Sequence, residues 1–262
     1  MNWRAMLSAG LAALMAAGVA WVAASRPDGR LHVTVLNTGS SPAVLVRTGD
    51  GSTALIDGGS NPSLLQAALG RVLPPATSHL DMVVVTGGEV TAVSGLSGLP
   101  GHYGVGIVVT PGVLNPGGNN VVSALENAGA DVLTPGSAAW SFGGATWRCL
   151  GFLALATGRT MCAVTVDDVT GRLLVLGDAG TADQEQLCAI YTTGLGADLV
   201  VTPPGGATSP LLLVTAHPRE LAVPLAAGLP AVPPPPGYAT DRTSIDGDLE
   251  YSGGAAGLVA SQ

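Results

Sequence analysis

The sequence contains no lysine, and charged residues make up only 11% of its 262 positions, well below the ~25% that is usual in soluble domains. The formal net charge is −8, and no run of basic residues occurs. Because nucleic-acid affinity depends largely on basic side chains that neutralise phosphates, this balance argues against a broad nucleic-acid-binding surface. The acidic charge helps to keep the chain soluble.

Cysteine is also scarce, with only Cys149, Cys162 and Cys188 present. None belongs to a C-x-x-C pair or lies close to a histidine, which excludes a zinc-finger type of site. Cys149 and Cys162 fall in two predicted strands joined by a turn, so they are placed to form one disulfide if the domain is exported. The alternative is that all three are small buried hydrophobic residues.

An uncharged segment, residues 5–24, follows Arg4 near the N-terminus. Its length is sufficient for one helix to span a bilayer. We favour an uncleaved membrane anchor over a cleaved signal peptide, for which Val22-Ala23-Ala24 offers a small-residue cleavage site. Either interpretation predicts an extracytoplasmic location for the rest of the chain, anchored at the cell membrane or exported.

Beyond a short linker, the chain shows two halves, each a group of strands followed by strand–helix units. The first half predicts strands at 32–36, 43–47, 53–56, 82–86, 107–110 and 132–133, with helices at 62–72 and 121–127. The second half predicts strands at 138–142, 145–150, 161–166, 173–176, 198–201 and 211–215, helices at 181–191 and 218–227, and a final strand pair at 238–240 and 248–251.

This order predicts an α/β (α+β) fold in which two mixed sheets pack face to face with helices outside, a four-layer αββα sandwich preceded by an N-terminal hydrophobic helix. The expected domain organisation is an anchor or signal segment with its linker over residues 1–30, one domain over 31–252, and a flexible tail over 253–262.

Five motifs in order resemble the metallo-β-lactamase-like domain of the ComEC DNA-internalisation competence proteins. Nearly all of residues 31–251 is covered. Residues 31–59 contain strands ending in I-D-G-G, and residues 174–179 match a strand ending in G-D-A. Residues 86–96 stand where the family has T-H-x-H-x-D-H-x-x-G-L. Residues 200–209 stand where it has G-H-H-G-S, and residues 238–251 stand where it has Y-R-T-D-x-x-G-x-I.

The residues that would bind metal depart from this pattern. The resemblance implies histidine ligands for zinc or manganese and a bridging carboxylate. The positions of the family's H-x-H-x-D-H hold Gly87, Glu89, Thr91 and Ala92. The later metal histidine falls within residues 204–206, which read Pro-Gly-Gly, and the Gly and Asp of the family's first turn are Ser41 and Pro42. We therefore expect no bound metal and no other cofactor.

Three vestigial candidates remain, and none is assigned as catalytic. Asp178 stands at the family's bridging carboxylate, although such an acid can instead bind backbone N–H groups of its turn. Glu89 lies in the Gly-rich turn, and His217 precedes a proline as a late family histidine does. Asp57 is expected to brace its turn. The other histidines, His32, His79 and His102, are expected at packing or surface positions.

The leading hypothesis is a membrane-anchored, extracytoplasmic, metal-free and non-catalytic scaffold or binding domain, with a membrane channel or DNA-uptake protein as candidate partner. The alternative is a metal-dependent hydrolase of nucleic-acid phosphodiesters that uses Glu89, Asp178 and His217 as a reduced site. A third hypothesis is a cell-surface domain without any link to DNA. The sequence leaves the oligomeric state open.

Overall fold

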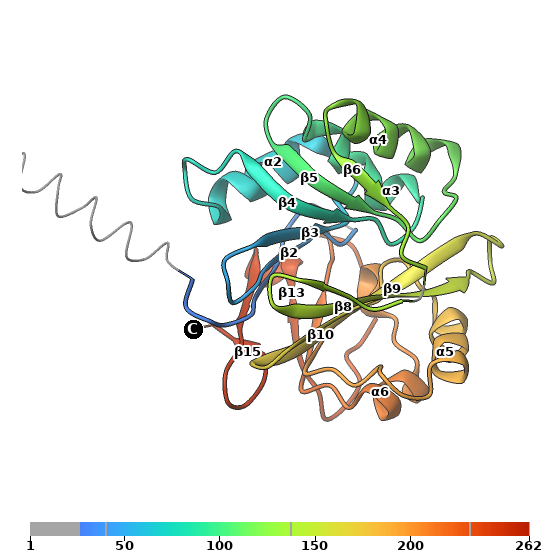
Figure 1. Cartoon of the computed structure of the whole chain (residues 1–262). Coiled ribbons are helices and arrows are strands. Elements are labelled where there is room, and N and C mark those ends of the chain that lie inside the picture. Colours follow the sequence, from blue (N-terminus) through green and yellow to red (C-terminus); the bar gives the residue numbers. More distant parts are fainter. Residues whose placement is uncertain (1–26, 40, 137, 231, 262) are drawn as a thin grey trace, which may run out of the picture.

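The computed structural model describes residues 27–39, 41–136, 138–230 and 232–261 (Figure 1). The predicted hydrophobic helix at residues 5–24 lies outside these ranges. Within them, no helix is long and apolar enough to cross a membrane.

Two mixed sheets form the centre of the molecule. The first has the order β15-β14-β1-β2-β3-β4-β5-β6, and the second has the order β13-β12-β11-β10-β9-β8-β7. The strands of the first sheet are β1 (His32–Val35), β2 (Val44–Arg47), β3 (Thr53–Ile56), β4 (His79–Val84), β5 (Gly104–Val109), β6 (Asp131–Leu133), β14 (Leu249–Ser252) and β15 (Val259–Ala260). The strands of the second are β7 (Trp140–Phe142), β8 (Ala145–Leu153), β9 (Thr160–Asp168), β10 (Gly171–Val175), β11 (Leu199–Val201), β12 (Glu220–Val223) and β13 (Ala239–Arg242).

Helices cover the outer face of each sheet, which confirms the predicted αββα layering (Figure 1). The first sheet carries α2 (Pro62–Val72), α3 (Val90–Val93), η1 (Ser94–Gly98) and α4 (Pro116–Asn127). The second carries α5 (Thr181–Ile190) and α6 (Pro210–Ala216), with η2 (Pro204–Gly206) and α7 (Thr243–Asp246) in its connections.

Local sequence explains where these helices begin. The Asn61 side chain accepts hydrogen bonds from the backbone N–H groups of Ser63 and Leu64, and Pro62 occupies the first turn of α2, where its missing N–H is not needed. One face of α2 is then buried through Leu65, Ala68 and Leu69, which attaches the helix to the sheet.

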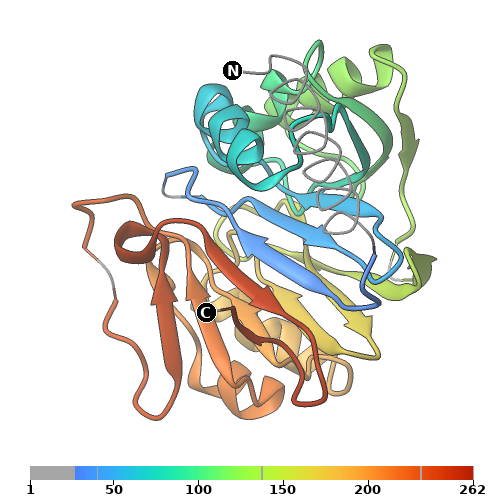
Figure 2. The same cartoon turned by 90° about the vertical axis from the view of Figure 1, so that its left-hand side faces the viewer.

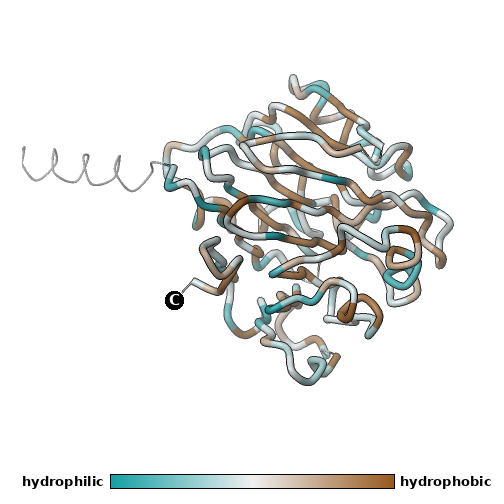
Figure 3. The backbone as a smooth tube through the Cα atoms, turned by 60° about the horizontal axis from the view of Figure 1, so that its bottom comes forward, coloured by the Kyte–Doolittle hydropathy of each residue, from teal (hydrophilic) through white to brown (hydrophobic). Residues whose placement is uncertain are grey.

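Three apolar layers hold the sandwich together. The central layer lies between the sheets and includes Trp147, Tyr251 and the disulfide-bonded pair Cys149–Cys162. The outer two lie between each sheet and its helices. Figure 3 shows hydrophobic residues running along the strands through the interior.

Several predicted elements were wrong, most of them in the C-terminal half. Residues 211–215 lie in helix α6 rather than in a strand, and residues 218–227 contain strand β12 rather than a helix. The predicted final pair does not form, because β13 pairs with β12 whereas β14 pairs with β1 in the other sheet. Figure 2 shows β1 and β14 side by side.

Two further differences concern helix and chain ends. The helix predicted at 121–127 begins earlier, as α4 (Pro116–Asn127), because the Asn115 side chain accepts a hydrogen bond from Gly118 N and caps it. In the predicted flexible tail, β15 pairs with β14.

Candidate functional site at the strand ends

The carboxyl ends of parallel strands from both sheets meet at one edge of the sandwich. Asp57 follows β3 and Thr86 follows β4, which are parallel neighbours, while Asp178 follows β10. Ligands of open α/β sheets bind at such edges, so this is the candidate site.

Asp57 is the most deeply buried acid at this edge, with no exposed surface. Its carboxylate accepts hydrogen bonds from the backbone N–H of Thr86 at 2.9 Å and from the Thr86 hydroxyl at 2.6 Å. Burial raises the pKa of Asp57 to about 7, the two bonds from Thr86 oppose this shift, and the charge of Asp178 adds to it. Asp57 thus braces two strand ends, a larger role than the local turn contact that was predicted.

Asp178 is partly buried, and within the described residues no hydrogen bond to its side chain is found. This contradicts the interpretation that it binds backbone N–H groups of its own turn. Burial raises the pKa of Asp178 to about 6, and the nearby charge of Glu89 raises it further. Asp57, Asp178 and Glu89 therefore interact electrostatically at one edge.

Glu89 is held by the turn that joins β8 to β9. Its carboxylate pairs with the Arg159 guanidinium at 2.6 Å. The same hairpin contacts the strand end again, because Cys162 N donates to Thr86 O at 2.7 Å. The hairpin thus covers the turn that follows β4.

Side-chain packing at this turn occupies the place of the family's first metal histidine. A Cβ added at Gly87 would lie 3.3 Å from both Cγ and Cε of Met161, a buried residue of β9. A Cβ at Gly88 would lie 2.8 Å from the backbone N of Asn115. Little space is therefore left for a larger side chain at either glycine.

The other family ligand positions offer no metal-binding side chain. Ala92 is buried, and its carbonyl accepts a hydrogen bond from Gly58 N. Thr91 is exposed in α3. The segment Pro204–Gly206 follows β11 at the same edge, with Gly206 against Val223.

His217 lies at the opposite end of the sheet. It ends helix α6 in a left-handed conformation with φ 48° and precedes β12, which runs parallel to β10 and β11. Asp178 follows the carboxyl end of β10, so the two residues are separated by the length of the strands. The predicted combination of Glu89, Asp178 and His217 is not assembled.

The remaining histidines contact neighbours on the surface. His32 lies between Asp28 and Ser252, and His79 is 3.8 Å from Asp81. His102 is exposed in the turn after η1.

A metal centre of the family's type does not fit the residues at this edge. Two metal ions need several histidine nitrogens and carboxylates around them. Within the described residues, no group of three or more His, Cys, Asp or Glu side chains is placed to hold a metal ion. The expectation that no metal binds stays a prediction, but no catalytic step through a metal follows from this geometry.

Sequence reasoning missed three contacts that shape the edge: the Asp57–Thr86 bonds, the Glu89–Arg159 ion pair and the packing of Met161 on Gly87. Each joins residues far apart in the chain. The family pattern places a histidine at position 87, and this was the only sequence signal that pointed to the packing of Met161 on Gly87.

Similarity to solved structures agrees with this architecture, while models of known protein families and curated proteins give no match. A diphosphatase of the PhnP family shares 15% identity over 86% of this chain and 99% of its own, with TM-score 0.53. The diiron β-hydroxylase CmlA from Streptomyces venezuelae shares 15% identity over 75% of this chain and 45% of its own, with TM-score 0.53. A CmlA variant shares 14% identity over 85% of this chain and 53% of its own, with TM-score 0.57.

These neighbours are members of the metallo-β-lactamase superfamily. The fold of this chain is the metallo-β-lactamase sandwich, as the sequence resemblance implied. The chain spans about half the length of CmlA. At such low identity the similarity shows the fold alone, and activity has to be argued from the residues at the strand ends.

Proposed function

We propose that this chain is a membrane-anchored, extracytoplasmic relative of the ComEC hydrolase domain that has lost its metal centre. It acts as a non-catalytic scaffold or binding domain, with a membrane channel or DNA-uptake protein as its partner.

One observation carries the proposal: the hairpin between β8 and β9 closes over the turn where the family holds its metal. Met161 packs on Gly87, and Arg159 engages Glu89 as its counter-ion. Metal binding energy depends on the number and geometry of the ligands. With these positions filled by packing and an ion pair, the edge is suited to structural stability rather than to hydrolysis.

The disulfide between Cys149 and Cys162 supports the proposed location. Disulfides persist in oxidising compartments such as the periplasm and the cell exterior and are rare in the cytosol. An alkaline phosphatase fusion at the C-terminus tests this location: an active fusion agrees with export, and an inactive but expressed fusion contradicts it.

Metal analysis tests the loss of the centre. The full chain, purified in detergent and incubated with zinc or manganese, is expected to retain far less than one ion per chain and to cleave no phosphodiester substrate. Stoichiometric metal that is lost in Asp178→Asn would overturn the proposal. The matched control is Asp131→Asn, which changes an exposed acid on β6.

Asp178 favours a second candidate, a hydrolase with a reduced site. Its carboxyl group has no hydrogen-bond partner among the described residues, and its raised pKa of about 6 is typical of functional acids. Phosphodiesterase activity that disappears in Asp178→Asn but persists in His217→Ala would support this candidate. Activity lost with both variants would contradict the placement of His217 on the far edge.

Binding of single-stranded DNA to this chain would count against the third hypothesis, a cell-surface domain without any link to DNA. The net charge of −8 predicts no direct binding even at low salt. Any link to DNA uptake would then run through the partner protein, and crosslinking in intact membranes would identify that partner.

A further inference from the structure

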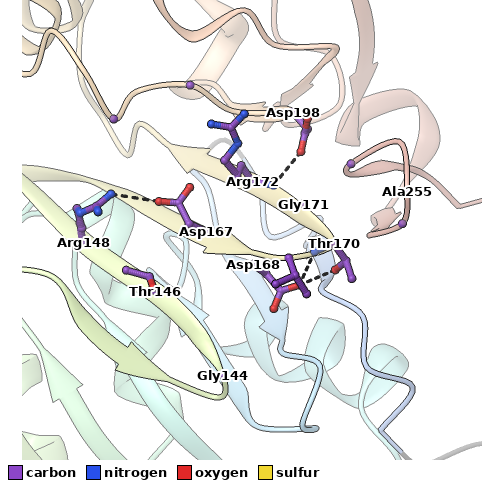
Figure 4. Close-up of a pocket in the computed structure, with 15 residues that line it drawn as sticks. Gly144, Thr146, Arg148, Asp167, Asp168, Thr170, Gly171, Arg172, Asp198 and Ala255 are labelled. Carbon is purple, nitrogen blue, oxygen red and sulfur yellow. Dashed lines mark hydrogen bonds and ion pairs between the residues drawn. The ribbon is translucent and has the colours of Figure 1, made fainter.

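A hollow lies at the end of the seven-stranded sheet opposite the candidate site (Figure 4). It is an open groove of about 630 Å³ between the β9–β10 turn, the loop before β11 and the turn before β15. Binding sites for small ligands commonly fall in the range of about 300–1,000 Å³. The two loops line the groove with residues that have no side chain: Gly194, Gly196, Gly254 and Gly257.

Two arginines and one acid stand side by side on its floor. Arg172 of β10 is directly opposite Asp167 of β9 in the antiparallel register. Arg148 of β8 pairs with the same Asp167 at 3.1 Å. Burial raises the pKa of Asp167, and the two arginines oppose that shift.

The acids of the groove are already engaged within the protein. Asp168 accepts hydrogen bonds from the backbone N–H and the hydroxyl of Thr170. Asp198 accepts from the backbone N–H of Arg172 and lies 3.8 Å from Arg219.

Arg172 differs from Arg148 because its guanidinium has no partner among the residues that the structure describes. Within the described part of the chain, no ion pair or hydrogen bond involves that group, and it lies against the loop at Gly196. A planar guanidinium offers a fork of N–H donors that matches the two oxygens of a carboxylate.

A buried hydroxyl on the same sheet face is also unsatisfied. Thr165 lies two residues before Asp167 on β9 and directly opposite Arg148, and residues two apart on a strand share one face. Its side chain is 2% exposed, and its hydroxyl oxygen has no hydrogen-bond partner in the described ranges of the chain. Buried polar groups are rarely left unpaired, but Thr165 does not line the groove and therefore offers no contact to a ligand there.

We propose that this groove binds the carboxylate group of a ligand through Arg172. The neighbouring acids make a doubly charged phosphate less favourable than a carboxylate, because like charges at short range repel and a carboxylate adds only a single negative charge next to the Arg172 guanidinium. The ligand is a small carboxylic acid or the C-terminal carboxylate of a peptide. The groove and the strand-end edge lie at opposite ends of the sheet, so this proposal stands independently of the proposed function.

Ligand-observed NMR on the full chain in detergent tests the proposal with three probes: acetate, N-acetyl-trialanine with a free carboxylate, and its C-terminal amide. The free acid is expected to bind at least about tenfold more tightly than the amide, since a charge-assisted hydrogen bond is lost. Tighter binding of the peptide acid than of acetate would identify a peptide terminus as the source, and the reverse would identify a small acid.

Variants tie the binding to one side chain. Arg172→Gln is expected to weaken binding of the acid about tenfold, and Arg172→Lys less, because it keeps the charge but loses the fork. Arg47→Gln, which changes an exposed arginine of the other sheet, is the control and binds like the wild type. Thermal unfolding confirms that each variant is folded. Equal affinity for acid and amide, no saturable binding of the acid, or unchanged binding by folded Arg172→Gln would overturn the proposal.

Discussion

Asp57 accepts two hydrogen bonds from Thr86, although 29 positions separate the two residues in the chain. The bonds tie the end of β3 to the end of β4, and Thr86 O in turn accepts from Cys162 N of the other sheet. Asp57 takes a left-handed conformation with φ 55° to make this contact, which is uncommon for a residue other than glycine. Hydrogen bonds between the protein's own groups thus hold the strand-end turn in place.

Asp57→Ala should lower the free energy of unfolding by about 2–4 kcal/mol, because the N–H and the hydroxyl of Thr86 lose their acceptor in a buried place. Asp57→Asn should cost less, since asparagine keeps one acceptor oxygen and tolerates the left-handed conformation. Urea denaturation at pH 5, below the raised pKa of Asp57, where the neutral carboxyl carries no penalty for burying a charge, measures both. If Asp57→Ala matches the wild type within about 0.5 kcal/mol, a level typical of neutral surface changes, the bracing role is wrong.

The raised pKa of Asp178 predicts that stability decreases with rising pH. Its pKa is 3.8 in the unfolded chain and about 6 in the folded protein, so the folded state binds the proton more tightly. This contribution is fully present below about pH 4 and is lost as the pH rises through 6. Asp57, with a folded-state pKa of about 7, acts in the same direction.

Asp178→Asn should therefore flatten the pH profile. Between pH 4 and pH 8 the variant is expected to lose about 3 kcal/mol less stability than the wild type. Denaturation midpoints across a pH series measure the difference. A variant profile parallel to that of the wild type would show that burial does not raise the pKa of the Asp178 carboxyl.

The sequence predicted the layers and the first half of the fold well, because apolar periods and turn residues are local signals. Asn61-Pro62 ahead of an amphipathic stretch is such a local signal, and α2 begins there as predicted. Residues 211–215 show the limit: Leu-Leu-Leu-Val-Thr suits a strand as well as a short buried helix, and length and context decide. His217 was chosen because it precedes a proline, as a late family histidine does, and the structure places it at the end of helix α6, away from Asp178.

The candidate site was predictable in its location but not in its contacts. The family pattern identified the turn after β4, while the partners of that turn come from β3 and from the β8–β9 hairpin, up to 75 positions away from Gly87 in the case of Cys162 (162 − 87). A single sequence carries no signal for such pairings. The groove around Arg172 was missed for the same reason, because its lining comes from segments that are distant in the sequence.

Gly87→His restores the residue type that the family has at this position, and we expect it to destabilise the protein instead of creating a metal site. The new Cβ already meets Met161 at 3.3 Å, so the imidazole must displace that side chain. Overpacking of this kind costs about 1–3 kcal/mol. Zinc titration and urea denaturation of the variant measure the two effects.

Gly87→Ala, as the smaller substitution at the same position, should cost less than Gly87→His. Adding Met161→Ala to Gly87→His should recover part of the loss, because it vacates the space that the imidazole needs. Stoichiometric zinc binding by Gly87→His alone would show that the edge still has enough ligands for a metal, contrary to the packing argument.

The disulfide between Cys149 and Cys162 should account for a large share of the stability of the β8–β9 hairpin, which covers the candidate site. It closes a loop with a sequence separation of 13, and a cross-link of that span stabilises a fold by about 3 kcal/mol through the unfolded state. Reduction of the wild type should lower the free energy of unfolding by about that amount.

The double variant Cys149→Ala, Cys162→Ala should be comparably destabilised and should no longer respond to reductant. Cys188→Ala, at a buried cysteine outside the disulfide, should keep the full response. Alkylation of the denatured, unreduced wild type followed by mass spectrometry checks the premise directly, since labelling of all three cysteines would mean that the bond does not form.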